Sequence, residues 1–174
     1  AKMLARKDAV VAKNTKGIEF LFRKNKVTWL KGHGRFAGAA DGGYKIEVKG
    51  AETEVVTAKN VIIATGSKAR HLPDVPVDNE FICDNEGALS LPAVPKRLGV
   101  IGAGVIGLEL GSVWRRLGAD VTILEAVPTF LAACDEAVAK DAWKAFTKEQ
   151  GLKINLGVKL GRVARTKSGV SVEY

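Results

Sequence analysis

The sequence predicts an α/β fold in which a βαβαβ parallel sheet follows a smaller lobe that contains a β-meander. Beyond Pro95, apolar runs of strand length alternate with longer segments of helical periodicity, which is typical of a parallel sheet. Before Pro95, short runs rich in β-branched residues are separated by turn formers. A composition that is 47% hydrophobic and 26% charged is that of a globular protein, which excludes disorder and collagen-like repeats.

The first lobe is predicted to begin with a basic amphipathic helix over residues 2–24. Apolar side chains recur there at sevenfold and fourfold spacings and fall near one face, while lysines and arginines mostly occupy the others. Gly17 weakens the middle of this segment, so two helical pieces are also compatible with the sequence.

Short β-rich runs follow the helix, and the turn formers Asp41-Gly42-Gly43 between two of them predict a hairpin or meander. The runs occupy residues 27–30, 44–48 and 54–57. Residues 60–65 form a continuous apolar run closed by Gly66, for which we expect a strand buried on both faces.

Four prolines and several acidic residues mark residues 72–95 as a connection between lobes. We therefore expect three parts, namely the later part of one domain over 1–71, the connection over 72–95, and a second domain over 96–174.

The second domain is predicted to alternate strands with helices. The strands are expected at 98–102, 120–125 and 152–155, and the helices at 105–117 and 136–150. Asp135 is the expected N-cap of the second helix and Gly151 its expected stop. Residues 158–163 and 169–173 begin another hairpin, and the pattern ends at Tyr174 before a closing strand.

Three glycines at the spacing G-x-G-x-x-G end the first strand of this domain and open its first helix, which predicts a Rossmann-like dinucleotide site. The motif is Gly102-Ala103-Gly104-Val105-Ile106-Gly107. Gly102 permits a tight turn, Gly104 lets the backbone approach a pyrophosphate, and Gly107 lets the helix lie close to the strand. The helix amides and dipole then face the phosphates.

Two carboxylates accompany the motif. Glu125 lies 23 residues after Gly102 at the end of the next strand, where an acid can bind the adenosine ribose hydroxyls and repel a 2′-phosphate. This favours NAD over NADP. Glu109, one turn into the helix, either serves the site or is simply solvated near the helix dipole, and the residues alone leave both interpretations open.

The remaining reactive residues show no catalytic spacing. Cys83 and Cys134 stand 51 positions apart, which excludes a disulfide framework, a CxxC pair or a metal-ligand spacing. His33 and His71 have no carboxylate or second histidine at a useful spacing, so we expect both on the surface or in turns.

Composition also argues against two kinds of partner. The net charge of +8 is spread along the chain and only 6% of residues are aromatic, so neither a nucleic-acid footprint nor a base-stacking platform is predicted. The tryptophans, Trp29, Trp114 and Trp143, are expected to pack. No stretch approaches the roughly 18 to 20 apolar residues of a membrane span, and the first ten residues are too charged for a signal peptide. We expect a cytoplasmic protein.

Four segments together resemble the disulfide-dependent flavoprotein reductases. They are residues 32–36, 61–67, 84–90 and 100–125. Within this family, the stretch 87–125 is most similar to the branch that oxidises dihydrolipoamide carried on 2-oxo acid dehydrogenase complexes.

The resemblance implies cofactor contacts at matching positions. It implies that FAD is held partly at Gly34 and at Thr65, Gly66 and Ser67. It implies that NAD is held along Gly102 to Gly107, with Glu125 on the adenosine ribose and Leu160 near the adenine. Glu109 matches a helix carboxylate close to the nicotinamide and flavin. The resemblance also implies a homodimer.

The chain departs from the family pattern in ways that bear on activity. It has no earlier G-x-G-x-x-G, no Cys-x4-Cys pair and no His-Glu base. We therefore interpret it as a middle fragment with an incomplete NAD domain, expected to be inactive alone. A non-catalytic NAD-binding module is the alternative, and a nucleic-acid binder a third.

Overall fold

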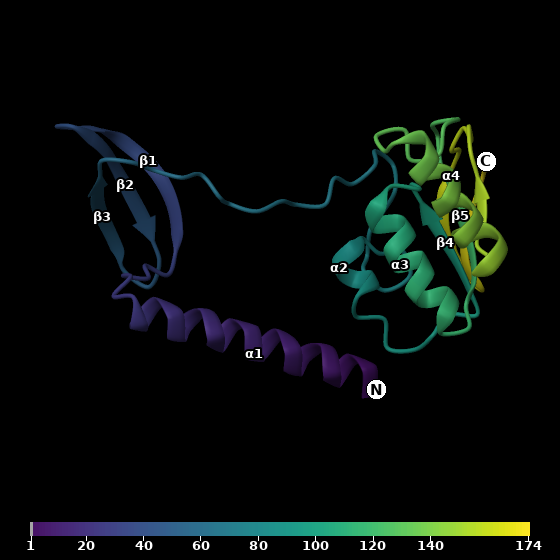
Figure 1. Ribbon diagram of the computed structural model, residues 1–174, viewed down its shortest axis with the longest axis horizontal. Coiled ribbons are helices and arrows are strands. Elements are labelled where there is room, and N and C mark those ends of the chain that lie inside the picture. Colours follow the sequence, from purple (N-terminus) through teal and green to yellow (C-terminus); the bar gives the residue numbers. More distant parts are fainter. Residues whose placement is uncertain (1) are drawn as a thin grey trace. The chain divides into compact units, whose positions relative to one another are not determined.

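The protein consists of two compact units, the first ending at Ser67 and the second comprising Lys68–Tyr174. The computed structural model describes residues 2–174, and Figure 1 shows the elements of both units. Residues 2–174 form one parallel sheet and two antiparallel sheets, together with helices, which confirms the predicted α/β fold class. Residues 72–95 lie in the second unit.

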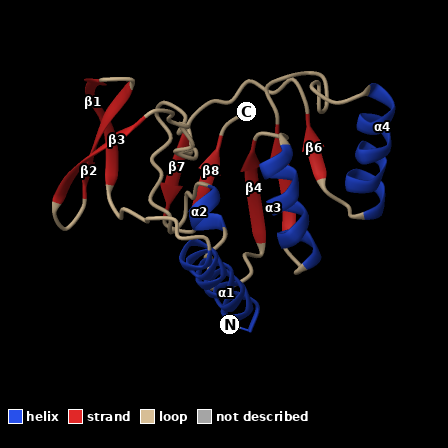
Figure 2. Cartoon of the chain, turned by 60° about the vertical axis from the view of Figure 1, so that its left-hand side comes forward, coloured by secondary structure: helices blue, strands red, loops and turns tan. Residues whose placement is uncertain are grey.

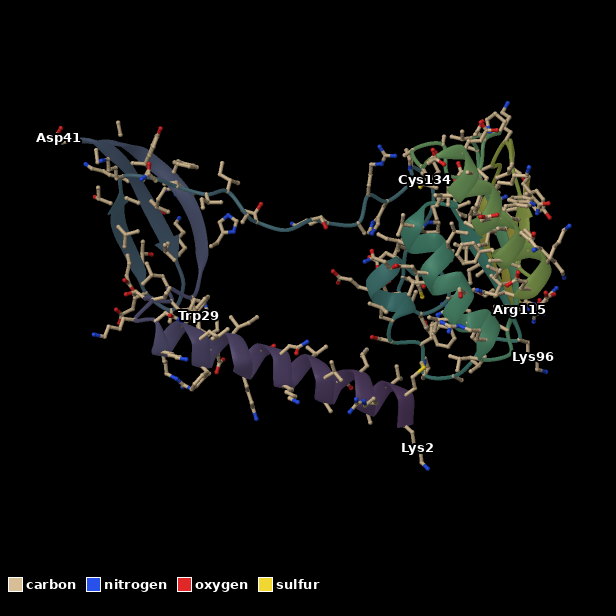
Figure 3. All side chains as sticks on the ribbon, viewed as in Figure 1. Lys2, Trp29, Asp41, Lys96, Arg115 and Cys134 are labelled. Atoms are coloured by element: carbon tan, nitrogen blue, oxygen red, sulfur yellow. The ribbon has the colours of Figure 1, made fainter. Side chains whose placement is uncertain are left out.

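The first unit begins with α1 (Lys2–Lys24), a single helix that continues through Gly17. The possibility of two helical pieces is therefore not realised. After the helix ends, the ring of Trp29, which is labelled in Figure 3, meets Phe22 edge to face at 5.8 Å between centroids.

Three antiparallel strands complete the first unit in the order β1-β2-β3, which confirms the predicted meander. They are β1 (His33–Ala40), β2 (Gly43–Lys49) and β3 (Thr53–Ala58). Asp41 and Gly42 form the turn between the first two strands, as expected.

Two strand predictions in this unit are wrong. Residues 27–30 are irregular because they lead from α1 to β1, and β1 itself went unpredicted because it contains no β-branched residue. Residues 60–65 are also irregular, with Ile62 90% and Ile63 72% exposed. An apolar run becomes a strand only where a neighbouring strand accepts its backbone hydrogen bonds, and sheet pairing stops at β3.

The second unit is built on a parallel sheet of order β4-β5-β6, as predicted. Its strands are β4 (Arg97–Ile101), β5 (Asp120–Leu124) and β6 (Lys153–Asn155). The helix α3 (Val105–Arg116) joins β4 to β5 and lies beside them in Figure 2. Val121 and Ile123 of β5 are fully buried, so the central strand forms the middle of the core.

The second long helix is only partly α-helical. It comprises α4 (Glu136–Lys144) and the π-helix η1 (Ala145–Glu149). Asp135 caps it by accepting from the amides of Ala137 and Val138, and Gly151 follows it with φ +72°, so both predicted ends are confirmed. Gln150 follows the π-helix, and its Oε1 accepts from the Ser112 hydroxyl at 2.7 Å, which ties the end of this helix to α3.

The remaining elements of this unit are short. They are α2 (Asn85–Ala88), β7 (Val163–Thr166) and β8 (Gly169–Val172). The last two form the expected hairpin, although its first strand begins only at Val163. Trp114 is buried and Trp143 packs edge to face on Phe130, as expected for packing residues. Among residues 2–174, no helix has the length and apolar content needed to cross a membrane.

Candidate functional site

The glycine motif forms the turn from β4 into α3, at the carboxyl end of the parallel sheet. Gly102 has φ +102°, a region that favours glycine, and its N–H donates to the Leu124 carbonyl at 2.8 Å. The turn is therefore fixed to the end of the neighbouring strand. Ligands of open α/β sheets bind at this edge.

The other two glycines of the motif differ in the space around them, which is crowded at Gly107 and open at Gly104. A Cβ on Gly107 would collide with the Gly102 carbonyl oxygen and lie 3.3 Å from Cγ1 of Val100. A Cβ on Gly104 would meet nothing within 4 Å. Gly107 is thus required for the approach of helix to strand, whereas Gly104 borders open space that a ligand can enter.

The first turn of α3 opens onto that space. Gly104 is the N-cap and makes no side-chain capping bond, so the first amides of the helix remain available to an anion. Val105 and Ile106 are 62% and 59% exposed, and Glu109 is exposed one turn further on. The helix end therefore offers amides beside an apolar surface.

Glu125 lies across the motif immediately after β5. Its Oε2 accepts from the buried Ala103 N–H at 2.7 Å, and its Oε1 accepts from the Val127 N–H at 2.9 Å. The structure thus brings the predicted acid to the predicted loop. The bond to Ala103 was not predicted, because nothing in the spacing indicates which amide a carboxylate will reach.

Leu160 lies on the segment that follows the end of β6. This segment runs beside Glu125, whose carbonyl accepts from the Val158 N–H at 2.9 Å. Leu160 is half-buried and lines a shallow groove with residues 72–75 and 161–163.

The positions matched to the flavin contacts lie in the first unit and are all exposed. Gly34 belongs to β1 and pairs with Val48, while Thr65, Gly66 and Ser67 belong to an irregular segment. Gly66 has φ +75°. These four exposed residues therefore do not form an enclosed site.

The two cysteines do not form a disulfide with each other. Cys83 and Cys134 are both free, and burial together with the charges of Asp78 and Asp84 raises the pKa of the Cys83 thiol. A raised pKa disfavours the reactive thiolate. Within residues 2–174, no group of three or more His, Cys, Asp or Glu is arranged to hold a metal ion.

His71 corrects one expectation. It is exposed, as predicted, but its Nε2 lies 3.2 Å from Oδ2 of Asp84, so it does have a carboxylate partner. The two are 13 positions apart, a separation that only the folded chain brings together. His33 is exposed at the start of β1, as expected.

The fold and the site define a dinucleotide-binding α/β protein. The chain belongs to the pyridine nucleotide-disulphide oxidoreductase family, whose model matches residues 1–174. The resemblance to flavoprotein disulfide reductases is therefore confirmed, and proteins of this family use FAD and NAD(H).

Several known proteins are similar to the whole chain. Dihydrolipoyl dehydrogenase of Cupriavidus necator is 68% identical over 100% of this chain and 36% of that protein. Dihydrolipoyl dehydrogenase 3 of Pseudomonas putida is 51% identical over 99% of this chain and 36% of that protein. The crystal structure of LpdA from Mycobacterium tuberculosis matches with a TM-score of 0.88 and 27% identity, over 98% of this chain and 38% of that one. The chain thus spans little more than a third of these relatives.

Proposed function

We propose that this chain supplies the NAD-binding part, and a portion of the FAD-binding part, of an oxidoreductase that reoxidises dihydrolipoamide. The similarity to proteins named dihydrolipoyl dehydrogenase supports the reaction. The observation that carries the NAD assignment is the open space over Gly104 at the first turn of α3, one residue after the Ala103 amide that donates to the Glu125 carboxylate.

The residues present fit the pyrophosphate and ribose of NAD. The space over Gly104 is one that a side chain would fill, and the first helix amides supply donors for the phosphate oxygens. Glu125 would accept from the adenosine ribose hydroxyls with lone pairs left over from its two backbone bonds. Bound NAD would supply the ring that accepts a hydride.

The protein's own contribution is therefore binding and orientation. The loop from Gly102 to Gly107 would hold the diphosphate through the backbone of Val105 and Ile106, while the buried amide of Ala103 stays bonded to Glu125. Glu109, exposed one turn into α3, would stand beside the nicotinamide, and Leu160 beside the adenine.

The flavin part of the proposal depends on the family resemblance. The residues that would contact FAD are Gly34, Thr65, Gly66 and Ser67. The FAD domain would include residues 1–71 and the NAD domain residues 96–174, with residues 72–95 as the connection between them. The proposal extends to a cytoplasmic homodimer that acts on dihydrolipoamide carried on a 2-oxo acid dehydrogenase complex. This part of the proposal is supported by the name of the similar protein, dihydrolipoyl dehydrogenase.

Calorimetric titration of the chain with NAD tests the NAD site. We expect saturable binding that Gly104→Thr abolishes, because the new side chain fills the space that the diphosphate needs. Gly99→Thr is the matched control, since a Cβ there also meets nothing within 4 Å but lies within β4. Equal NAD affinity in the unaltered chain and Gly104→Thr would refute the site.

A further inference from the structure

The Ala103 amide gives the glycine loop a second tie to the chain at the end of β5, beside the bond from Gly102 to Leu124. Ala103 is only 3% exposed, and a buried amide requires a hydrogen-bond acceptor. That acceptor is Oε2 of Glu125, 22 residues further along the chain. A side chain therefore replaces the water or backbone carbonyl that would ordinarily satisfy this amide.

The carboxylate is held at both oxygens. Oε1 accepts from the Val127 N–H at 2.9 Å, while the Glu125 N–H donates to the Asn155 carbonyl and its carbonyl accepts from Val158. The backbone that carries the carboxylate is thus tied to the ends of β5 and β6. Glu125 can transmit that rigidity to the loop because its own position is fixed.

The rest of the loop is constrained from two sides. Gly102 is bonded to Leu124, and Gly107 lies against the Gly102 carbonyl. Ala103 lies between these two anchors, and its amide donates to the Glu125 carboxylate. This bond therefore fixes the part of the loop that the two anchors do not.

We propose that Glu125 is a positioning residue for the glycine loop, which it holds in its ligand-ready backbone before any nucleotide binds. This role is additional to a contact with ribose, and it rests on the proposed function because the ligand is taken to be a nucleoside diphosphate. It implies that Glu125 supports the binding of ligands that offer it no hydroxyl group.

Amide hydrogen exchange in the nucleotide-free chain tests the positioning itself. We expect the Ala103 amide to exchange about tenfold faster or more in Glu125→Ala, since a charge-assisted hydrogen bond is lost. Glu125→Gln retains one acceptor oxygen, so its Ala103 exchange rate should lie between those of the unaltered chain and Glu125→Ala. Asp120→Asn is the control, because it removes a carboxylate charge from the opposite end of β5, where Asp120 forms an exposed pair with Lys153. Unchanged exchange at Ala103 in Glu125→Ala would overturn the proposal.

Binding of ADP and of its 2′,3′-dideoxy analogue separates positioning from ribose recognition. If Glu125 binds only the ribose hydroxyls, Glu125→Ala should leave the affinity for the dideoxy compound unchanged. The affinity could even rise, because the substitution removes a negative charge near the phosphates. A positioning residue predicts that affinity for the dideoxy compound falls about tenfold in Glu125→Ala and less in Glu125→Gln. No fall in that affinity would overturn the proposal. If the unaltered chain binds neither compound, the proposed function fails, and the exchange measurement still decides whether Glu125 holds the loop.

Discussion

Gly107 lies directly against the carbonyl oxygen of Gly102, so the two outer glycines of one hexapeptide close the turn between β4 and α3. Gly104, between them, borders open space. The same motif therefore contains a glycine required by the fold and a glycine that leaves open space beside the backbone.

This difference predicts opposite effects on stability. Gly107→Ala should lower the free energy of unfolding by about 1–3 kcal/mol, because its Cβ collides with backbone that cannot move without displacing α3. Gly104→Thr should change that free energy by no more than about 0.5 kcal/mol, since threonine is an adequate N-cap in open space. Urea denaturation of both variants measures the difference. Equal destabilisation by the two substitutions would contradict the packing described for Gly107.

Glu125 is expected to set the preference for NAD over NADP. A carboxylate at the ribose meets the 2′-phosphate as a like charge, so Glu125→Ala should narrow the ratio of the two affinities and Glu125→Arg should narrow it further or reverse it. Both variants lose the bond to Ala103, so absolute affinities should fall as well. The ratio, measured by calorimetry with both nucleotides, is the informative quantity. A ratio that stays constant across the variants would exclude Glu125 from the ribose site.

Asp78 should make the second unit sensitive to acid. Its carboxylate accepts from the amides of Ile82, Glu80 and Phe81, and these bonds lower its pKa to about 2. A lowered pKa in the folded state means that the contribution to stability is complete above the unfolded-state pKa and is lost as the pH falls through about 2. Melting temperatures measured from pH 5 down to pH 2 should therefore fall less steeply in Asp78→Ala. Parallel profiles for the two proteins would disprove this role for Asp78.

We expect the 174-residue chain by itself to have no dihydrolipoamide dehydrogenase activity. Thiol-disulfide exchange needs an attacking thiolate and a nearby sulfur to accept it, and Cys83 and Cys134 are 51 positions apart and both free. Flavin retention should also be poor, since the matched flavin contacts are exposed. The assay supplies dihydrolipoamide, NAD and excess FAD and follows NADH formation. Turnover above background would show that these cysteines suffice or that no cysteine pair is needed.

Sequence patterns predicted the second unit better than the first, for a physical reason. In the second unit, the hydrophobic periodicity and the capping residues indicate the same elements. The strand expected at 120–125 is therefore observed at Asp120–Leu124, and the N-cap expected at Asp135 is correct. In the first unit, β1 is held by pairing with β2 although its own residues have little strand preference. Pairing between distant segments is not encoded in either segment alone.

The candidate site divides in the same way. Spacing is enough to predict that the glycines form the turn from β4 into α3 and that Glu125 follows β5, because the motif encodes a local turn and the strand that follows. The bond from Ala103 to Glu125 and the contact of His71 with Asp84 join segments 22 and 13 positions apart. Such contacts depend on the tertiary fold, which no local pattern specifies.

The exposed pair Ile62 and Ile63 is expected to influence how the protein behaves in concentrated solution. Ile62 and Ile63 present bare apolar side chains on backbone that makes no sheet pairing. Short β-prone segments with unpaired backbone can template pairing between separate molecules. Self-association that rises with protein concentration is the expected result, and it would begin at this run rather than at the sheets on either side.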